Sequence, residues 1–377
     1  MTGINRMIIF SVIILLLLVY FLQLYIYEKF WNKSLDINIT ISPKELFAME
    51  NGTLIEVITN GKKLPLPFVC VKFITSKYLS FKDKGNSCIT DKYYRNDLFS
   101  LLGYQKITRT LDFTAIKRGY YTLSDITLLS SDILMSKNFT QNIKNKGYIY
   151  VYPRQIQTKD FQVPKNSLLG SILTQKSLYE DPLVFNGLKE YEPYDNINSI
   201  NWKATAKVNS IMVNKYSKTS SLQIDFYLNV ELPPFSSNGI IEDSISIVSS
   251  LCRYFLENEI EVSLNTNGID CINDSIINIS SSTGKNQLNK INHSLSRIDL
   301  TKSPENFIDI INKINKETSS SLKILVSSYV NKDLIDKLNE IKIKHKNVIL
   351  IIPCYYSYKN EIINNIDIIR WEVKGYV

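Results

Sequence analysis

The stretch from Gly187 to Tyr216, GLKEYEPYDNINSINWKATAKVNSIMVNKY, separates two kinds of sequence and decides how the chain is divided. Before it, short runs alternate apolar and polar residues, which is the pattern of half-buried strands. After it, apolar strands alternate with helical stripes. The stretch itself concentrates acids, lysines and aromatic residues: Glu190, Glu192, Asp195, Lys203, Lys207, Lys215, Tyr191, Tyr194 and Trp202.

This segment resembles the signature of the domain of unknown function 58 family, in which R-E-Y-x-x-G-D-x-x-R-x-I-D-W-K-x-x-A-R precedes a hydrophobic strand. The residues that match are Glu190, Tyr191, Asp195, Ile200, Trp202, Lys203 and Ala206. Lysine replaces arginine at Lys189 and Lys207, while Tyr194, Asn198 and Asn201 replace a glycine, an arginine and an acid. The family has no established reaction, so the resemblance implies an architecture and not an activity.

Two shorter elements of the family lie upstream. An R-G-x-Y element is present at Arg118-Gly119-Tyr120-Tyr121 and a V-Y-P element at Val151-Tyr152-Pro153, whereas the usual D-P-F-G-L loop has become Asp132-Ile133-Leu134-Met135. The resemblance implies a β-sandwich-like domain followed by an α/β domain similar to the von Willebrand factor A domain. It also implies a partner, because relatives are often encoded beside MoxR-type AAA+ ATPases.

The composition argues against several classes of function. With 377 residues, 44% hydrophobic and 21% charged, the chain has the profile of two globular domains and a membrane segment. Its net charge of +8 comes from scattered lysines and not from a basic stripe, so we expect no nucleic-acid binding. Five cysteines without a C-x-x-C pair argue against zinc and against a closed disulfide framework. A histidine-based catalytic site has only His293 and His345 to draw on.

A nearly continuous apolar run from Ile8 to Tyr27 is long enough to cross a bilayer, which takes about 20 helical residues. A cleaved signal peptide would have a shorter apolar core that ends in small residues. This run instead meets aromatic residues typical of a membrane interface: Tyr20, Tyr25, Tyr27, Phe30 and Trp31. We therefore expect a retained single-pass anchor. Lys29 and Lys33, against Arg6 on the other side, favour a cytoplasmic body, as do the unpaired cysteines.

From residue 34 to residue 155 the sequence predicts an antiparallel β-sandwich-like domain. The predicted strands are Leu35–Ile41, Thr53–Thr59, Leu66–Thr75, Gln105–Ala115, Tyr120–Leu129 and Tyr148–Tyr152. Asn60-Gly61, between the second and the third, is a turn signal. Regular short strands without helical periodicity are typical of a sandwich.

From Ser221 onward the pattern predicts an α/β domain. We expect strands at Ile224–Val230, Ile260–Leu264, Ile276–Ile279, Leu322–Val326 and Val348–Ile352. We expect helices at Ile240–Asn258, Leu288–Ile298, Pro304–Ile314 and Lys332–Ile343. Such alternation implies a mainly parallel sheet covered on both faces, an order compatible with a von Willebrand factor A-like domain.

The cation site of an A-type domain is degenerate in this sequence. The resemblance implies an Asp-x-Ser-x-Ser turn after the first strand, and hard cations need such oxygen clusters. Here Asn229, Glu231 and Pro233 stand in place of the acid and the two serines. Ser327 stands at the later acidic position. We therefore expect no metal and no other cofactor.

The carboxylates of the signature allow two interpretations. Glu190, Glu192 and Asp195 could act as acid–base groups, but the sequence brings no two of them together and offers no histidine or cysteine nearby. The alternative is a structured linker, in which acids pair with lysines and Trp202 is buried in an apolar seam between domains. We favour the linker, and with it no catalytic residue.

The chain is thus expected to contain a transmembrane anchor at 1–33, a β-sandwich-like domain at 34–155, a signature linker at 156–220 and a degenerate von Willebrand factor A-like domain at 221–377. The expected function is that of a membrane-anchored interaction or scaffold protein without enzymatic activity, working with a MoxR-type AAA+ ATPase. Two alternatives stay open: an enzyme acting at the envelope, and an extracytoplasmic adhesion or assembly module.

Overall fold

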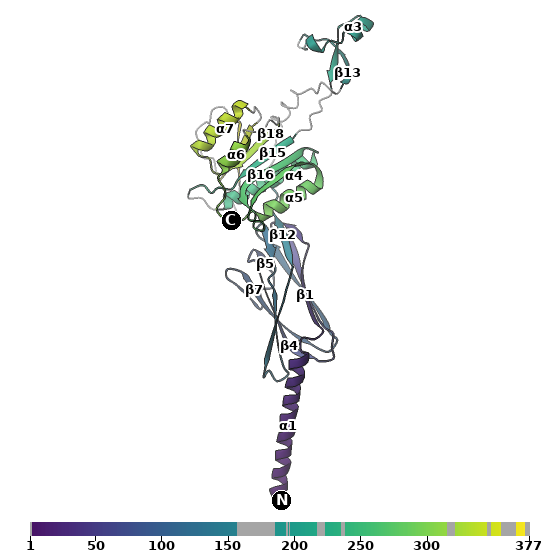
Figure 1. Ribbon diagram of the computed structural model, residues 1–377, viewed down its shortest axis with the longest axis vertical. Helices are drawn as coiled ribbons and strands as arrows, with labels where there is room; N and C mark the ends of the chain where they lie inside the picture. The colour runs from purple at the N-terminus through teal and green to yellow at the C-terminus, as the bar shows by residue number, and fades with distance from the viewer. Residues whose placement is uncertain are drawn as a thin grey trace. The chain divides into compact units, whose positions relative to one another are not determined.

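The computed structural model describes residues 2–156, 185–193, 195, 197–216, 223–234, 238–314, 321–344, 348–355 and 367–373. The chain divides into two compact units, Met1–Arg154 and Gln155–Val377. The first unit carries an N-terminal helix and a β-sandwich, and the second carries an α/β sheet and a small hairpin with a helix (Figure 1).

The N-terminal helix α1 (Thr2–Phe30) carries the apolar run. Its residues Ile8–Phe30 form a helix long and apolar enough to cross a membrane, and most of their side chains are exposed. The end of the helix is fastened to the sandwich: Tyr27 and Trp31 are buried in the sandwich core, and the Trp31 ring stacks on Phe139 with 5.7 Å between ring centroids. These two members of the expected aromatic belt therefore hold the helix to the protein and do not face the membrane interface.

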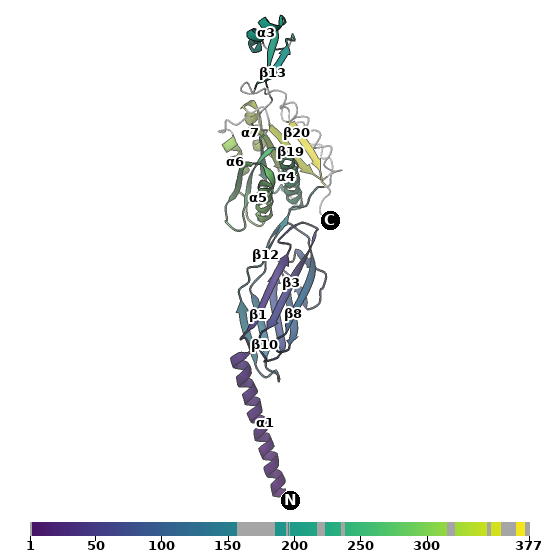
Figure 2. The ribbon, with the colours of Figure 1, turned by 90° about the vertical axis from the view of Figure 1, so that its right-hand side faces the viewer.

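Twelve strands form the β-sandwich among the described residues of the first unit. They are β1 (Leu35–Ser42), β2 (Glu45–Phe47), β3 (Asn51–Asn60), β4 (Leu66–Thr75), β5 (Leu79–Phe81), β6 (Ser87–Ile89), β7 (Tyr93–Leu101), β8 (Lys106–Ala115), β9 (Gly119–Thr122), β10 (Ile126–Ser131), β11 (Asn138–Ile143) and β12 (Tyr148–Tyr152). One sheet has the order β1-β3-β8-β5 and the other β11-β10-β4-β7-β6. A third sheet, β2-β12-β9, lies at the end of the sandwich away from α1 (Figures 1 and 2).

The antiparallel, sandwich-like arrangement that the sequence predicts is confirmed, with corrections in detail. The single strand predicted at Tyr120–Leu129 is wrong, because β9 and β10 belong to different sheets. The turn at Asn60-Gly61 ends β3 but leads to β4 in the opposite sheet, so these strands are not a hairpin. Strand β7 is absent from the prediction, because its inward positions include the charged Arg95 and Asp97.

The second unit contains a six-stranded sheet. Its strands are β15 (Gln223–Asn229), β16 (Glu261–Ile269), β17 (Ile276–Ser282), β18 (Leu322–Ser327), β19 (Val348–Cys354) and β20 (Asp367–Glu372), in the order β17-β16-β15-β18-β19-β20. Neighbouring strands pair in parallel, except β16 with β17.

Helices cover both faces of this sheet (Figure 1). Helices α4 (Gly239–Glu257) and α5 (Gly284–Arg297) share one apolar core with the strands, while α6 (Phe307–Ile314) and α7 (Lys332–Lys344) share another. The prediction of a mainly parallel sheet with two covered faces is confirmed. Strand β20, at the edge of the sheet, is not among the predicted strands.

Within the segment expected to be a linker, the described residues form a small element of their own. Strands β13 (Phe185–Glu190) and β14 (Met212–Tyr216) pair antiparallel. Between them lie the 3-10 turn η1 (Ile197–Ser199) and helix α3 (Trp202–Val208). We call residues 185–193, 195 and 197–216 the signature element.

Candidate interaction surfaces

Local hydrogen bonds fix the shape of the signature element. Asn201 caps α3, since its Oδ1 accepts a hydrogen bond from a first-turn amide at 3.0 Å, and its Nδ2 donates to Asn214 Oδ1 on β14 at 2.8 Å. Thr205 Oγ1 accepts from the Met212 amide at 3.0 Å, which fastens the helix to the hairpin. Asn209 ends the helix in the left-handed region, at φ 62°.

Two acids of the signature are bound to one lysine. Lys189 Nζ lies 2.6 Å from Asp195 Oδ1 and 3.4 Å from Glu192 Oε2. The hydrogen bond from Lys189 lowers the pKa of Asp195, and the same bond raises the pKa of Lys189. Both groups are therefore held in their charged forms, which suits an ion pair and does not suit exchange of a proton near neutral pH.

The other signature residues do not join this cluster. Glu190 is exposed on β13, and Lys203 and Lys207 are exposed on α3. Tyr191 is partly buried, and Tyr194 lies outside the described residues. The described part of the signature thus pairs some of its acids and lysines, as expected of a structural segment. The absence of a catalytic residue stays a prediction.

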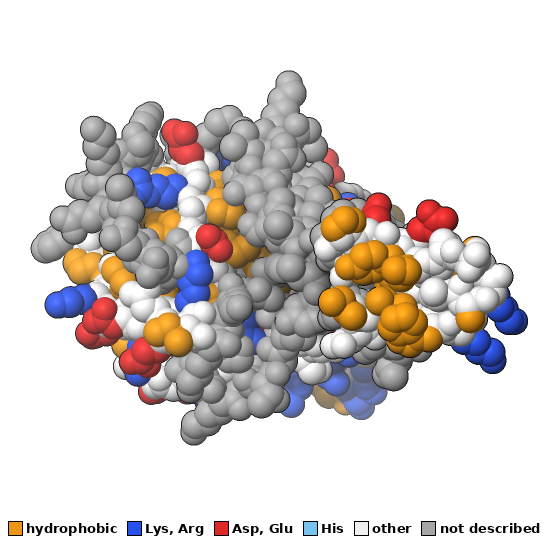
Figure 3. Space-filling view, turned by 90° about the horizontal axis from the view of Figure 1, so that it is seen from above, with side chains coloured by type: hydrophobic (Ala, Val, Ile, Leu, Met, Phe, Trp, Pro, Cys, Tyr) orange, Lys and Arg blue, Asp and Glu red, His pale blue; other side chains and the backbone are white. Residues whose placement is uncertain are grey.

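Large apolar side chains of the signature element are exposed to solvent. They are Leu188 (42% exposed), Ile197 (68%), Trp202 (69%), Val208 (57%) and Ile211 (46%). We call these five residues the apolar face, and Figure 3 shows hydrophobic side chains gathered on this part of the molecule. The expectation that Trp202 is buried in a seam is wrong: α3 turns Ala204 inward, and Trp202 lies on nearly the opposite side of the helix.

A second candidate surface lies where the parallel strands of the α/β sheet end. Asn229 on β15 and Ser327 on β18 are neighbours in register, and Asn229 Nδ2 donates to Ser327 Oγ at 3.0 Å. Asn267 on β16 donates to Asn229 Oδ1 at 2.9 Å, and its own Oδ1 accepts from the Val230 amide at 2.9 Å. In the sequence, β15 is followed by β16 and β17, which lie on one side of it in the sheet, and then by β18, β19 and β20, which lie on the other. Strand order therefore reverses at β15. Open α/β sheets commonly bind ligands at such a point.

A cavity of about 360 Å³ opens beside these amides. Its lining includes the carboxylates of Glu231 and Asp333 together with three asparagines, and contains no lysine or arginine among the described residues. Glu231 Oε1 accepts from the Phe307 amide, at the start of α6, at 2.8 Å. The cavity is therefore suited to neutral or basic hydrogen-bonding groups and not to an acidic ligand.

The positions that correspond to an A-type cation site take part in this hydrogen-bond network. Asn229 directs its amino group to Ser327, Glu231 binds a backbone amide, and Pro233 offers no side-chain ligand. Among the described residues, no group of three or more His, Cys, Asp or Glu side chains is placed to hold a metal ion. The sequence analysis misses Asn267, because the predicted strand ends at Leu264 whereas β16 continues to Ile269.

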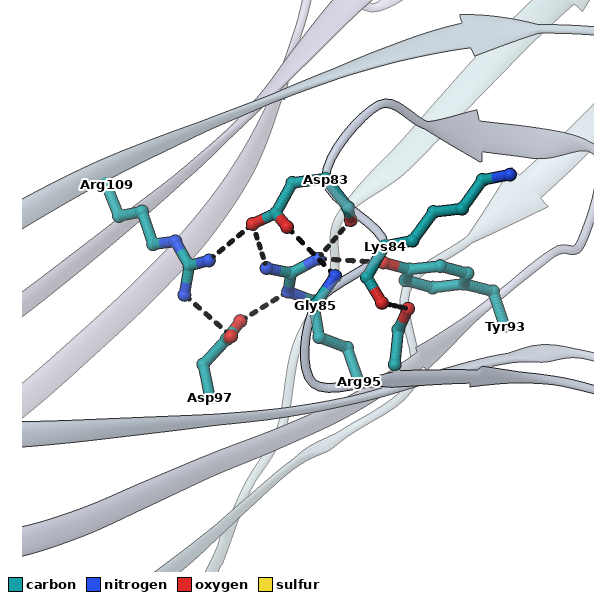
Figure 4. Close-up of polar contacts among 8 residues, drawn as sticks. Asp83, Lys84, Gly85, Tyr93, Arg95, Asp97 and Arg109 are labelled. Carbon is teal, nitrogen blue, oxygen red and sulfur yellow. Dashed lines mark hydrogen bonds and ion pairs between the residues drawn. The ribbon is translucent and has the colours of Figure 1, made fainter.

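Inside the sandwich, charged side chains occupy inward positions of β7 and β8. Arg95 is fully buried: its Nε lies 2.5 Å from Asp97 Oδ2, and its other nitrogens donate to Tyr93 Oη at 2.8 Å and to Asp83 Oδ2 at 2.9 Å (Figure 4). Arg109 reaches the same two carboxylates, Asp97 at 2.6 Å and Asp83 at 2.8 Å. The two arginines and two aspartates balance one another in charge.

Glu56 on β3 is a second buried carboxyl group beside these arginines, in addition to Asp97. It is 1% exposed and lies opposite Arg109 in the strand register. Because the arginines are already matched by Asp83 and Asp97, an ionised Glu56 would add an unbalanced buried charge. Burial, and then the charge of Asp97, raises the pKa of Glu56 from 4.5 to about 7.

No family model matches the chain, and no curated protein sequence matches it. Among solved structures, it is similar to a CARDB domain from Pyrococcus furiosus crystallised with di-metal ions, with 15% identity and a TM-score of 0.21 over 32% of this chain and 93% of that one. It is also similar to a cohesin of scaffoldin B from Acetivibrio cellulolyticus in complex with a dockerin, with 11% identity and a TM-score of 0.23 over 30% of this chain and 98% of that one. Likenesses of this size carry no argument about function.

Proposed function

We propose that the chain is a membrane-anchored interaction protein that binds a protein partner through the apolar face of the signature element. The observation that carries the proposal is Trp202, which is 69% exposed on an element that exposes four further large apolar side chains. Exposed apolar patches mark interaction sites, because exposing apolar surface to water is energetically unfavourable and a partner that covers it removes this cost. Tryptophan is also enriched among the residues that contribute most to binding.

The hydrogen bonds of the signature element support the same proposal. Asn201, Thr205 and the Lys189–Asp195 pair already hold the hairpin and helix together. Folding of the element therefore does not require Trp202, and the exposed indole is available for a partner. A rigid element that presents a large aromatic ring loses little conformational entropy on binding.

The anchor, the orientation and the partner belong to the same proposal. Helix α1 supplies a single membrane span, with Lys29 in its last turn and Lys33 just beyond it. Lys62 adds a positive charge at the same end of the sandwich, where its Nζ donates to the Lys33 carbonyl at 2.8 Å. Positive charge beside a span favours the cytoplasmic side. We propose a cytoplasmic body, and a MoxR-type AAA+ ATPase as the partner that the resemblance implies.

We also propose that the α/β unit is a degenerate von Willebrand factor A-like domain of the domain of unknown function 58 family. Its mainly parallel sheet and the hydrogen-bonded amides at Asn229 and Asn267 support this assignment. In such a domain, contact with a partner would not pass through a cation. The cavity beside Glu231 would instead take a neutral or basic group of the partner.

The binding test uses the full chain in lipid nanodiscs and a MoxR-type ATPase purified from the same organism. Trp202→Ala is expected to weaken binding at least about 30-fold, since a residue of this kind contributes about 2 kcal/mol or more. Leu98→Ala is the matched control, because Leu98 is a large apolar residue exposed on β7 of the other unit. Equal affinity of the wild type and both variants would show that the apolar face is not the binding surface.

The orientation test uses Cys88, an exposed natural thiol on the sandwich, in a Cys271→Ser background that removes the other exposed thiol. A membrane-impermeant maleimide should leave Cys88 unlabelled in intact cells and label it after lysis. Cys88→Ser controls for the remaining cysteines. Labelling in intact cells would place the sandwich outside, exclude a cytoplasmic ATPase and favour the adhesion module or the envelope enzyme.

A further inference from the structure

The end of the sandwich that receives α1 carries an apolar turn. Between β10 and β11, Ile133, Leu134 and Met135 are 53%, 61% and 56% exposed. Turns on a protein surface are normally polar, and three consecutive large apolar residues in water are unfavourable. We call Ile133–Met135 the apolar turn.

Asp132 fixes the apolar turn beside the helix. Its Oδ2 accepts hydrogen bonds from Gln23 Nε2 at 2.8 Å and from Ser136 Oγ at 2.7 Å. Its Oδ1 accepts from the Lys137 amide at 2.8 Å, and Lys137 Nζ lies 2.7 Å from Glu28 Oε1 on the helix. The turn is thus attached to α1 at both of its ends.

The level of this attachment lies within the apolar span. Gln23 belongs to Ile8–Phe30, and at 1.5 Å per residue it lies about 10 Å from the Phe30 end of the span. The span is about 35 Å long, whereas the hydrocarbon core is about 30 Å thick and each headgroup layer adds about 5–7 Å. A helix placed with most of this span in hydrocarbon therefore brings Gln23, and the turn beside it, to the edge of the bilayer or inside it.

A second turn at the same end presents a similar surface. Leu102 and Tyr104, between β7 and β8, are both exposed, and the Tyr104 amide donates to the Lys62 carbonyl at 3.0 Å. Lys62 Nζ in turn donates to the carbonyl of Trp31, directly after the helix, at 2.8 Å. Tyrosine and lysine at the level of lipid headgroups, with leucine beside them, are typical of membrane-contacting surfaces.

We propose that the apolar turn, together with Leu102 and Tyr104, inserts into the interfacial layer of the lipid bilayer. The helix and the two turns then hold the sandwich in one orientation on the membrane. This inference rests on the proposed function, because it requires α1 to cross the bilayer. It adds that the first unit contacts the lipid surface directly and is not only tethered to it by α1.

The test places a single fluorescent label in the full chain, with Cys88 and Cys271 replaced by serine, in vesicles of phosphatidylcholine and phosphatidylglycerol. The label is attached at Leu134→Cys in the apolar turn. A matched control, Ile116→Cys, carries it on an exposed apolar residue at the other end of β8. A third position, Leu17→Cys, reports on the middle of α1.

At position 134 we expect loss of fluorescence with a nitroxide on the lipid headgroup and little loss with aqueous iodide. At position 116 we expect the reverse, and at position 17 loss only with a nitroxide deep on the acyl chain. If position 134 responds like position 116 while position 17 stays deep, the turn lies in water and this inference is wrong, although the anchor stands. If iodide also reaches position 17, α1 does not cross the bilayer and the proposed function fails with it.

Discussion

Replacing Glu56 by glutamine is expected to stabilise the β-sandwich at pH 8 and to leave its stability nearly unchanged at acid pH. In the folded protein, burial and the neighbouring Asp97 raise the pKa of Glu56 from 4.5 to about 7. In the unfolded chain, a glutamate ionises near pH 4.3. Glutamine keeps the size and polarity of the protonated acid but cannot ionise. The comparison therefore isolates the cost of burying this charge.

The direction of this pH effect follows from the number of protons that the folded and the unfolded protein bind at Glu56. Between pH 4.5 and about 7, the unfolded chain has lost the Glu56 proton while the folded protein keeps it, so the free energy of unfolding falls as the pH rises. Above this range Glu56 is ionised in both the folded and the unfolded state, and the free energy of unfolding falls no further at this site. Each pKa unit corresponds to about 1.4 kcal/mol, so the wild type loses about 3 kcal/mol at this site, and Glu56→Gln recovers it.

Urea-dependent hydrogen exchange of the full chain in detergent can measure this effect. Peptides from β3 and β7 report on the sandwich separately from the second unit. With about 1–3 kcal/mol per molar urea, the midpoint of Glu56→Gln should lie about 1–3 M above that of the wild type at pH 8. At pH 4.5 most of this difference should disappear. Asp36→Asn, which replaces an exposed carboxylate on β1, serves as the control and should shift little at either pH. An equal shift for Glu56→Gln at both pH values would refute the reasoning.

Three further results are expected. Arg95→Met should destabilise the sandwich by about 3–5 kcal/mol in the same exchange experiment, because it leaves Asp97 buried with one partner fewer; a change below about 1 kcal/mol would contradict the buried pair. Trp202→Ala should change the free energy of unfolding by less than about 0.5 kcal/mol, measured in urea, and a larger loss would mean that the indole is covered within the chain. Millimolar magnesium or manganese should leave the melting temperature unchanged, because Asn229 and Ser327 bind each other; a saturable rise would reveal a cation site.

Periodicity in the sequence predicts the elements whose buried side chains are apolar. Helix α4, with a buried stripe that includes Ile241, Ile245 and Leu256, matches its predicted bounds to within one residue at each end. The buried strands β15 and β18 match as closely. Strand β7 fails for a physical reason: alternation is present, but charged residues alternate inward. A pattern of polarity cannot distinguish such a strand from a loop.

Burial within the signature element depends on geometry that a short segment does not encode. Large apolar side chains are usually buried, and on this basis the sequence predicts a buried Trp202. Helix α3 has seven residues and a single buried position, Ala204, so its sequence shows no stripe that would identify the inward face. Residues two positions apart in an α-helix are separated by a rotation of about 200° about the helix axis. When Ala204 packs inward, Trp202 therefore points outward. The packing of the helix on its hairpin decides the exposure, and the sequence of α3 does not.

Three of the features described above break the rule that apolar side chains lie inside and charged ones outside, and they break it in two directions. Trp202 and the turn at Leu134 put apolar surface into water, and no hydrogen bond within the chain can offset that cost. Arg95 and Asp97 put charge into the core, but their mutual contacts and those with Arg109 offset much of the cost internally. The first two are the surfaces for which we propose contacts outside the chain, a protein partner for Trp202 and a lipid bilayer for the turn. The third acts within the sandwich, where the ionisation of Glu56 links its stability to pH.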